Sequence, residues 1–232
     1  MDEVCAYEDQ GWEDRVLLGG TSTGDSPRDK LLELYSGLGI YTRFYVKVRC
    51  WLLQLERYAE FVPPDGVLVD IGCGQGVLAN YLSLRFPGSQ VIGIDSNPKR
   101  IEVALKTVGE RGNINFLLKD ARGWALPSCT GVVMTDFLHH LSRQDQELIL
   151  QKAFDSLEKG GRLVILESDP TAKPIYGYWL SYLSDKFLYP FSKTSFRKPY
   201  EWENTLSHLG FDVKTIKMKY LIFSPVLYVC QK

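Results

Sequence analysis

The sequence predicts an α/β domain with a doubly wound, mostly parallel sheet of seven strands and helices on both faces. Three observations support this fold class. After residue 66, short β-rich runs alternate with longer runs of helical periodicity, which is typical of βαβ units. The length of 232 residues suits one sheet of this size with its covering helices. Apolar residues make up 45% of the chain and charged residues 24%, so a sizeable core can form.

The first 64 residues precede the sheet. Residues 1–27 are acidic and rich in Gly, Ser and Thr, a composition that predicts a flexible tail. Residues 28–64 carry apolar and aromatic side chains at helical spacing, which predicts N-terminal cap helices that end in a Pro-Pro-Asp-Gly turn. The chain shows neither a secretory signal pattern nor a run of the roughly 18 apolar residues that a spanning helix needs. We therefore expect a cytoplasmic protein, for which peripheral contact with a membrane surface stays open.

The core is expected in residues 66–167. Its predicted parallel strands are Val67–Ile71, Gln90–Ile94, Ile114–Leu118, Gly131–Asp136 and Arg162–Glu167. The helices between them are predicted near 77–86, 99–111 and 143–157. We expect Lys159-Gly160-Gly161 to cap the last helix and to lead into the fifth strand.

The remainder of the chain departs from this alternation. Residues 168–198 form a long insertion after the fifth strand, dense in aromatics and interleaved with Lys and Arg, and long connections usually carry function. Residues 199–232 predict a C-terminal helix at 200–209 and a strand hairpin at 212–220 and 225–230. The insertion suits a substrate lid, an amphipathic membrane contact, a dimer interface or a cover for the core.

Charge and cysteine content narrow the function classes. The formal net charge is −1, so no global positive field attracts nucleic acid. The five cysteines form neither a CxxC motif nor a cluster with histidine, which predicts reduced thiols and neither a metal site nor a disulfide framework.

A glycine-rich turn is the most informative motif. Residues 67–76 read VLVDIGCGQG, an apolar strand that runs into glycines before a predicted helix. Val77 stands where a dinucleotide motif requires its third glycine, and the Gly-Lys-Ser/Thr of a phosphate loop is absent. Asp70 would repel a pyrophosphate but suits a ligand that carries an ammonium and a sulfonium.

This turn resembles the first motif of the class I, Rossmann-like S-adenosylmethionine-dependent methyltransferases, an acid and an apolar residue followed by GxGxG. The positions that match or lie within it are Asp70, Gly72, Cys73, Gly74 and Gly76. The resemblance implies that the acid ending the second strand holds the ribose hydroxyls of the cofactor and that an acid after the third strand lies near the adenine. The residues at these two places are Asp95 with Ser96, and Asp120 with Ala121.

Two later segments extend the resemblance to about residues 66–167. Residues 133–141 resemble the fourth motif, in which Asp136 is a candidate for lining the methyl site, and residues 157–165 resemble the segment that follows. Any one of these acids could occur by chance in an α/β sheet that binds no ligand. Acids at the ends of three successive strands are harder to explain in that way. Ligands of open α/β sheets bind at this edge, so the three acids together favour a binding site.

The resemblance implies an enzyme that uses S-adenosyl-L-methionine and releases S-adenosyl-L-homocysteine. The cofactor carries its own electrophile, so the protein aligns the acceptor and removes a proton where the acceptor has one. His139 and His140 follow the fourth strand and are the candidate general bases, with a structural role as the alternative for either. His140 corresponds to the histidine common in the resembling motif.

The acceptor is expected to be a small molecule or a lipid-like or quinone-like compound. The resemblance implies that the cap helices and the insertion select it, with Tyr41, Tyr45, Trp179, Tyr182 and Arg197 as candidate contacts. The fourth motif lacks the Asn/Asp-Pro-Pro-Tyr/Phe pattern of DNA amine methylases, so a nucleic-acid acceptor is disfavoured. Two rival functions stay open, a non-catalytic sensor or scaffold that binds the same cofactor and a nicotinamide-dependent oxidoreductase. The acceptor atom and the oligomeric state also stay open.

Overall fold

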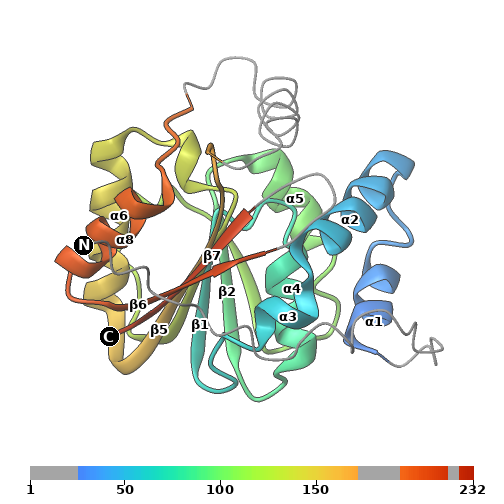
Figure 1. The fold of residues 1–232 in the computed structure, drawn as a ribbon. Coiled ribbons are helices and arrows are strands. Elements are labelled where there is room, and N and C mark those ends of the chain that lie inside the picture. Colours follow the sequence, from blue (N-terminus) through green and yellow to red (C-terminus); the bar gives the residue numbers. More distant parts are fainter. Residues whose placement is uncertain (1–25, 172–193, 219–224) are drawn as a thin grey trace, which may run out of the picture.

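A computed structural model describes residues 26–171, 194–218 and 225–232 (Figure 1). In these ranges one seven-stranded sheet has the order β3-β2-β1-β4-β5-β7-β6. The strands are β1 (Val67–Ile71), β2 (Gln90–Asp95), β3 (Ile114–Leu118), β4 (Cys129–Thr135), β5 (Leu157–Ser168), β6 (Asp212–Lys217) and β7 (Pro225–Gln231). The helices are α1 (Pro27–Leu34), α2 (Ile40–Leu53), α3 (Leu55–Ala59), α4 (Val77–Arg85), α5 (Pro98–Leu105), the 3-10 turn η1 (Leu138–His140), α6 (Arg143–Ser156) and α8 (Pro199–His208).

Strand pairing confirms the predicted fold class. Strands β1 to β5 are parallel, and β7 runs antiparallel between β5 and β6. Asp70 on β1 pairs with Gly93 on β2 and with Val133 on β4. The chain order reverses between β1 and β4, and ligands of open α/β sheets bind outside the carboxyl ends of the strands at such a reversal.

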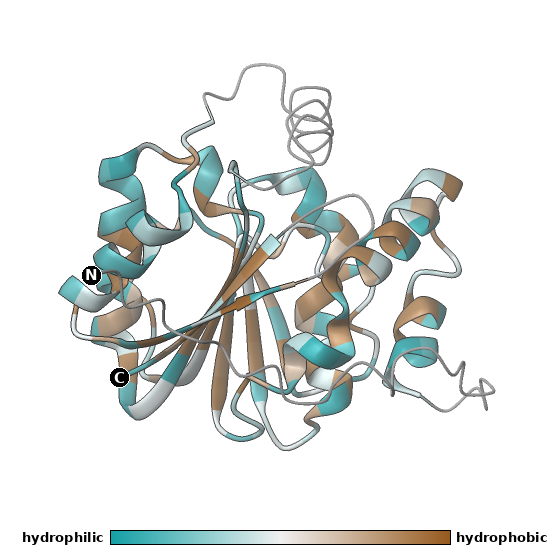
Figure 2. Cartoon of the chain, viewed as in Figure 1, coloured by the Kyte–Doolittle hydropathy of each residue, from teal (hydrophilic) through white to brown (hydrophobic). Residues whose placement is uncertain are grey.

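Helices cover both faces of the sheet. Figure 1 shows α6 and α8 on one side and α2 to α5 on the other, and Figure 2 shows the hydrophobic residues gathered on the strands between them. One buried cluster joins β1 and β5 to α1–α5, and the second joins the opposite strand faces to α6 and α8. Each fully buried large apolar side chain contributes about 1.5–3 kcal/mol relative to exposure, so these two clusters are the main source of stability.

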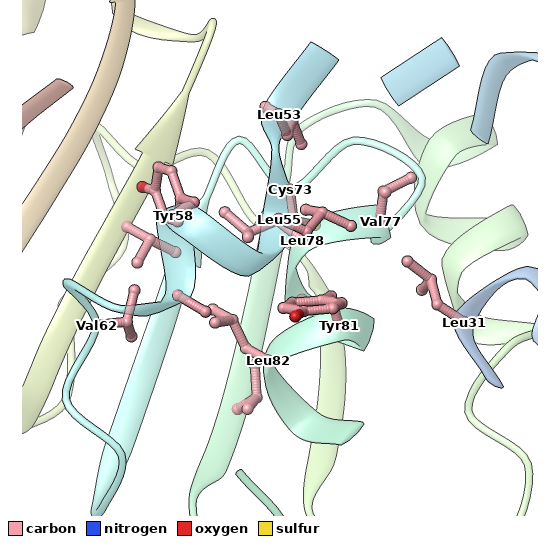
Figure 3. Packing of buried hydrophobic residues seen from close by; sticks show 14 of the residues in the cluster. Leu31, Leu53, Leu55, Tyr58, Val62, Cys73, Val77, Leu78, Tyr81 and Leu82 are labelled. Carbon is pink, nitrogen blue, oxygen red and sulfur yellow. The ribbon is translucent and has the colours of Figure 1, made fainter. Parts of the chain in front are cut away.

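The N-terminal helices are part of the first cluster. Figure 3 shows Leu55 beside Leu78 of α4, and Leu53 and Tyr58 belong to the same buried cluster. The hydroxyl of Tyr58 donates to the carbonyl of Val164 on β5 at 2.7 Å. The hydroxyl of Tyr35, just after α1, donates to the carbonyl of Gln75 in the glycine turn at 2.8 Å. These helices are thereby fixed to the sheet and to the turn.

Short-range signals explain where several helices begin. Ser26 caps α1, Asn97 caps α5 and Ser142 caps α6, each through a side-chain oxygen that accepts from the first helical turn. A proline occupies the first turn of both α1 and α5, where its missing N–H costs nothing.

The predicted cap at Lys159-Gly160-Gly161 is wrong. Helix α6 ends at Ser156, and these residues lie in β5. The β4–β5 register passes from Cys129↔Leu157 to Gly131↔Arg162, which is a bulge. A side chain at Gly161 would lie 2.9 Å from the carbonyl oxygen of Glu158. These glycines therefore serve strand pairing, which local helix signals do not report.

Several predicted segments fall partly outside the described residues. These are the tail 1–25, most of the insertion with Trp179 and Tyr182, and the end of the strand at 212–220. The proposed domain boundaries stay predictions. Of the helices in the described ranges, none is long and apolar enough to cross a membrane.

Candidate functional site

The glycine turn and the acid of β2 meet at the carboxyl edge of the sheet. The N–H groups of Gly72 and Cys73 both donate to the carbonyl of Ile94, at 2.8 and 3.0 Å. The N–H of Gly74 donates to Oδ2 of Asp95 at 3.0 Å. The structure therefore brings these predicted residues together through main-chain contacts.

The glycines of the turn have different physical roles. A Cβ on Gly72 would lie 2.6 Å from Cγ of Phe137, and one on Gly76 would lie 2.5 Å from Cζ of Phe116. At Gly74, where φ is +57°, the nearest atom to such a Cβ is the hydroxyl of Tyr45, at 3.9 Å. Internal packing thus requires the outer two glycines, whereas the middle glycine faces open space.

Asp70 is a buried acid without a hydrogen-bond partner. Its exposed fraction is 1%, and in the described part of the chain neither carboxylate oxygen has a partner. Burial raises the pKa of Asp70 to about 7, while the nearby backbone N–H of Ala79 in the first turn of α4 and the charge of Arg49 oppose this rise. An unpartnered buried carboxylate is costly, so its presence at this edge indicates a site for a cationic ligand.

Asp95 is 8% exposed and already partly satisfied. Its Oδ1 accepts from the N–H of Asn97 at 2.7 Å, and Oδ2 lies 3.8 Å from the guanidinium of Arg100. Each carboxylate oxygen has two lone pairs, so Asp95 can still accept from two hydroxyl groups. Ser96 follows it at an exposed position.

Asp120 and Ala121 occupy unlike environments. Asp120 is 46% exposed and pairs with Arg122, whose hydrogen bond lowers the pKa of the carboxyl. Ala121 is buried in the core. Within the described ranges no contact joins Asp120 to the turn, so its expected place near the cofactor stays a prediction.

Asp136 pairs with a residue that the sequence analysis missed. Asp136 has a φ of +47° just after β4, and its Oδ2 accepts from Nη1 of Arg49 on α2 at 2.6 Å. Burial lowers the pKa of Arg49, but Tyr45, Asp136 and Asp70 raise it more, so it stays charged. The two residues are 87 positions apart in the sequence, and no local motif indicates their contact.

A second missed residue, Glu167, organises the histidine segment. Glu167 lies near the end of β5 and accepts from the N–H groups of Phe137 and Leu138 at 3.1 and 2.7 Å. Its other oxygen lies 2.6 Å from Nδ1 of His139, and both side chains are 2% exposed. Glu167 is a fourth acid near the end of a predicted strand, and this position could have indicated it as a site residue.

The two histidines differ in burial. His139 stacks on Phe196, with ring centroids 4.7 Å apart, and is enclosed by the core. His140 is half-buried, and its ring lies 4.1 Å from that of His139. His140 is therefore the more exposed of the two, and a catalytic role for either histidine stays a prediction.

The candidate acceptor contacts also lie in different environments. Tyr45 faces Gly74, whereas Tyr41 is 89% exposed. Arg197 is expected to contact the acceptor, and this role stays a prediction; its buried guanidinium donates to Gln146 at 2.6 Å and to Thr205 at 2.7 Å. Arg197 therefore ties the segment before α8 to α6.

Comparison with known proteins identifies the family of this chain. A family model described as a methyltransferase domain matches residues 68–161. A demethylmenaquinone methyltransferase from Thermus thermophilus is 32% identical over 153 residues, covering 66% of this chain and 66% of that protein. The chain belongs to the class I S-adenosylmethionine-dependent methyltransferases.

Other relatives are less similar to this chain than the Thermus protein is. A bacteriochlorophyllide d C-20 methyltransferase from Chlorobaculum tepidum is 26% identical, covering 72% of this chain and 51% of that protein. A trans-aconitate 2-methyltransferase from Methylobacterium radiotolerans is 29% identical over 59% of this chain and 51% of that protein. The chain spans about half to two thirds of the length of these relatives.

Solved structures of other proteins have the same fold as this chain. The magnesium protoporphyrin IX methyltransferase from Synechocystis superposes with a TM-score of 0.64 at 17% identity, covering 88% of this chain and 93% of that one. A methyltransferase from Archaeoglobus fulgidus gives 0.63 at 22% identity, covering 84% and 100%. The matched range 68–161 includes the glycine turn and Asp136, but Arg49 and Glu167 lie outside it.

Proposed function

We propose that this chain is an enzyme that transfers the methyl group of S-adenosylmethionine to a small, lipid-soluble or quinone-like acceptor. The observation that carries the proposal is the buried carboxylate of Asp70, which has no hydrogen-bond partner in the described part of the chain. It lies at the edge where the turn and Asp95 meet, and a cationic ligand would satisfy it.

The residues present fit this cofactor. Asp70 suits the positive charge of the methionine part, Gly74 leaves room beside the backbone, and Asp95 retains lone pairs for the ribose hydroxyls. When bound, the cofactor supplies a methyl group on a positively charged sulfur. The chain has only to hold that group toward the acceptor and exclude water.

On the acceptor side, the ion pair of Arg49 and Asp136 and the segment after β4 form the neighbouring wall. Glu167 fixes the backbone that leads into η1, and thereby fixes where His140 lies. His140 takes up the proton of the acceptor where the acceptor group is protonated, since imidazole titrates near neutrality.

The acceptor class rests on chemistry that several relatives share by name. Demethylmenaquinone and bacteriochlorophyllide are the acceptors in the names of two of them, and both are large, apolar ring compounds. The exposed apolar residues of α2, described below, suit the same class. The name of a third relative, trans-aconitate methyltransferase, keeps a small polar acid as the alternative acceptor.

Cofactor binding is tested first, by calorimetric titration with S-adenosylmethionine. Asp95→Ala removes two charge-assisted hydrogen bonds and should weaken binding by roughly 2–4 kcal/mol. Asp212→Ala, an exposed acid on β6, is the matched control and should leave the affinity unchanged. Unchanged affinity in folded Asp95→Ala would remove Asp95 from the site.

Transfer is tested with labelled cofactor and a cell extract divided into lipid and aqueous fractions. The proposal expects label in an organic-soluble product. Label found only in a water-soluble acid would show that the acceptor is a small polar acid instead. Cofactor binding without transfer of label to either fraction would indicate a sensor or scaffold.

A further inference from the structure

Helix α2 exposes a hydrophobic stripe. The exposed fractions of Ile40, Phe44 and Trp51 are 68%, 69% and 47%. Their spacings of four and seven residues place them on one side of a helix with 3.6 residues per turn. Figure 2 shows hydrophobic residues along α2, at the rim of the molecule. Single exposed apolar residues are common on protein surfaces, but a continuous row of them indicates a contact surface.

The charge of this surface is of one sign. Arg43 and Lys47 are exposed on the same side of α2, and the helix has no acidic residue. Aromatic rings beside basic side chains are typical of helices that lie in the interface of an anionic membrane, where the rings enter the boundary and the cations meet headgroups. An acidic protein partner would use the cations but would leave the protruding apolar stripe without a complement.

A cavity of about 430 Å³ adjoins the stripe, between α1 and α2. The residues that line it are Leu32, Tyr35, Ser36, Ile40, Arg43, Phe44, Val46 and Lys47. The lining is largely apolar and includes both cations, which suits the chain and headgroup of an anionic lipid.

The opposite side of α2 belongs to the methyltransferase site. Tyr45 faces Gly74 of the turn, and Arg49 pairs with Asp136 after β4. We propose that α2 docks this enzyme on an anionic lipid bilayer, with Ile40, Phe44 and Trp51 in the interface and Arg43 and Lys47 against the headgroups. The purpose, delivery of a lipid-soluble acceptor to the site, rests on the proposed function, whereas the docking itself does not.

The test is co-flotation of the full chain with vesicles of phosphatidylglycerol or of phosphatidylcholine, in low and high salt. The proposal expects binding to phosphatidylglycerol that weakens as salt rises. Arg43→Gln with Lys47→Gln should weaken it about 30-fold, since each basic residue at an anionic surface contributes roughly fivefold. Phe44→Ser should weaken it about tenfold, because an apolar ring leaves the interface.

Matched controls lie on other elements. Lys214→Gln with Lys217→Gln removes two exposed cations from β6, and Leu148→Ser removes a 43% exposed leucine from α6. Both controls should float as the unchanged chain does. Equal losses in the controls, or equal binding to both lipids, would overturn the proposal. Self-association through Phe44 without vesicle binding would also overturn it and would assign the stripe to a second copy.

Cofactor titration separates this proposal from the proposed function. Phe44→Ser and the Arg43/Lys47 variant should bind S-adenosylmethionine as the unchanged chain does, because the side chains of α2 that reach Gly74 and Asp136 are Tyr45 and Arg49. Vesicle binding by a chain that binds no cofactor would support docking and refute the enzyme. Cofactor binding and methyl transfer without vesicle binding would support the enzyme and refute docking.

Discussion

The two sides of the proposed active site are built differently. The cofactor side is local, because N–H groups of the glycine turn donate to the carbonyl of Ile94 and to the carboxylate of Asp95, and Asp70 lies on the strand that leads into the turn. The acceptor side is assembled from distant parts, through the pairs Arg49–Asp136 and His139–Glu167. The first lies within the range that the methyltransferase family model matches, whereas Arg49 and Glu167 of the second lie outside that range.

The comparison predicts that Asp70 carries the largest energetic cost. Burial raises its pKa from the usual 3.8 to about 7, so between these values the folded chain holds a proton that the unfolded chain has released. The free energy of unfolding therefore falls as the pH rises from about 4 to 7, by up to roughly 4 kcal/mol from this group. Asp70→Asn should remove this slope and be the more stable protein at pH 8.

Urea denaturation of the cofactor-free chain at several pH values measures the effect. Asp65→Asn, an exposed acid before β1, is the control and should keep the slope of the unchanged chain. Parallel pH profiles for the unchanged chain and Asp70→Asn would show that Asp70 is solvated or paired.

Glu167→Gln should produce the next largest loss. The variant keeps the shape but replaces charge-assisted hydrogen bonds to two backbone N–H groups and to His139, at a cost of about 2–3 kcal/mol in the free energy of unfolding. Glu102→Gln, which alters an exposed pair with Lys106, is the control and should leave the free energy of unfolding almost unchanged. Equal costs for the two variants, measured in urea, would remove the organising role of Glu167.

The contact between Arg49 and Asp136 should give a smaller, measurable coupling. Arg49→Gln, Asp136→Asn and the double variant form a cycle, whose coupling energy we expect to be about 1–2 kcal/mol because the two charged atoms are 2.6 Å apart and Arg49 is only 19% exposed. The cycle for Arg122 and Asp145, whose charged atoms are 3.7 Å apart and whose arginine is 51% exposed, is the comparison and should give nearly zero. Equal couplings would place the first pair among ordinary surface pairs.

The smallest effect is expected at Asp120. Its pair with Arg122 is exposed, so Asp120→Asn should change the free energy of unfolding by less than about 1 kcal/mol. The sequence implies that this acid lies near the adenine, whereas its observed contact is with Arg122. A tenfold loss of cofactor affinity in Asp120→Asn would restore the implied role, and unchanged affinity would assign Asp120 to the surface.

The difference between the two sides also explains what the sequence could predict. The strand periodicities, the glycine turn and the acids at strand ends are local patterns, and the predicted fold class and family are confirmed. The partners of Arg49 and Glu167 lie 87 and 28 residues away, so no spacing reports them. The contacts of Arg197 could not be predicted for the same reason, because its partner Gln146 lies 51 residues earlier.

The phenols of Tyr35 and Tyr58 end on main-chain oxygens of the glycine turn and of β5. Because of these bonds and the apolar packing around them, helices α1 to α3 are an integral part of the half of the domain that carries the glycine turn. A chain shortened to begin at Val67 would leave Leu78, Tyr81 and Leu82 facing water. We expect that fragment to aggregate, so the smallest unit able to hold the nucleoside includes α1.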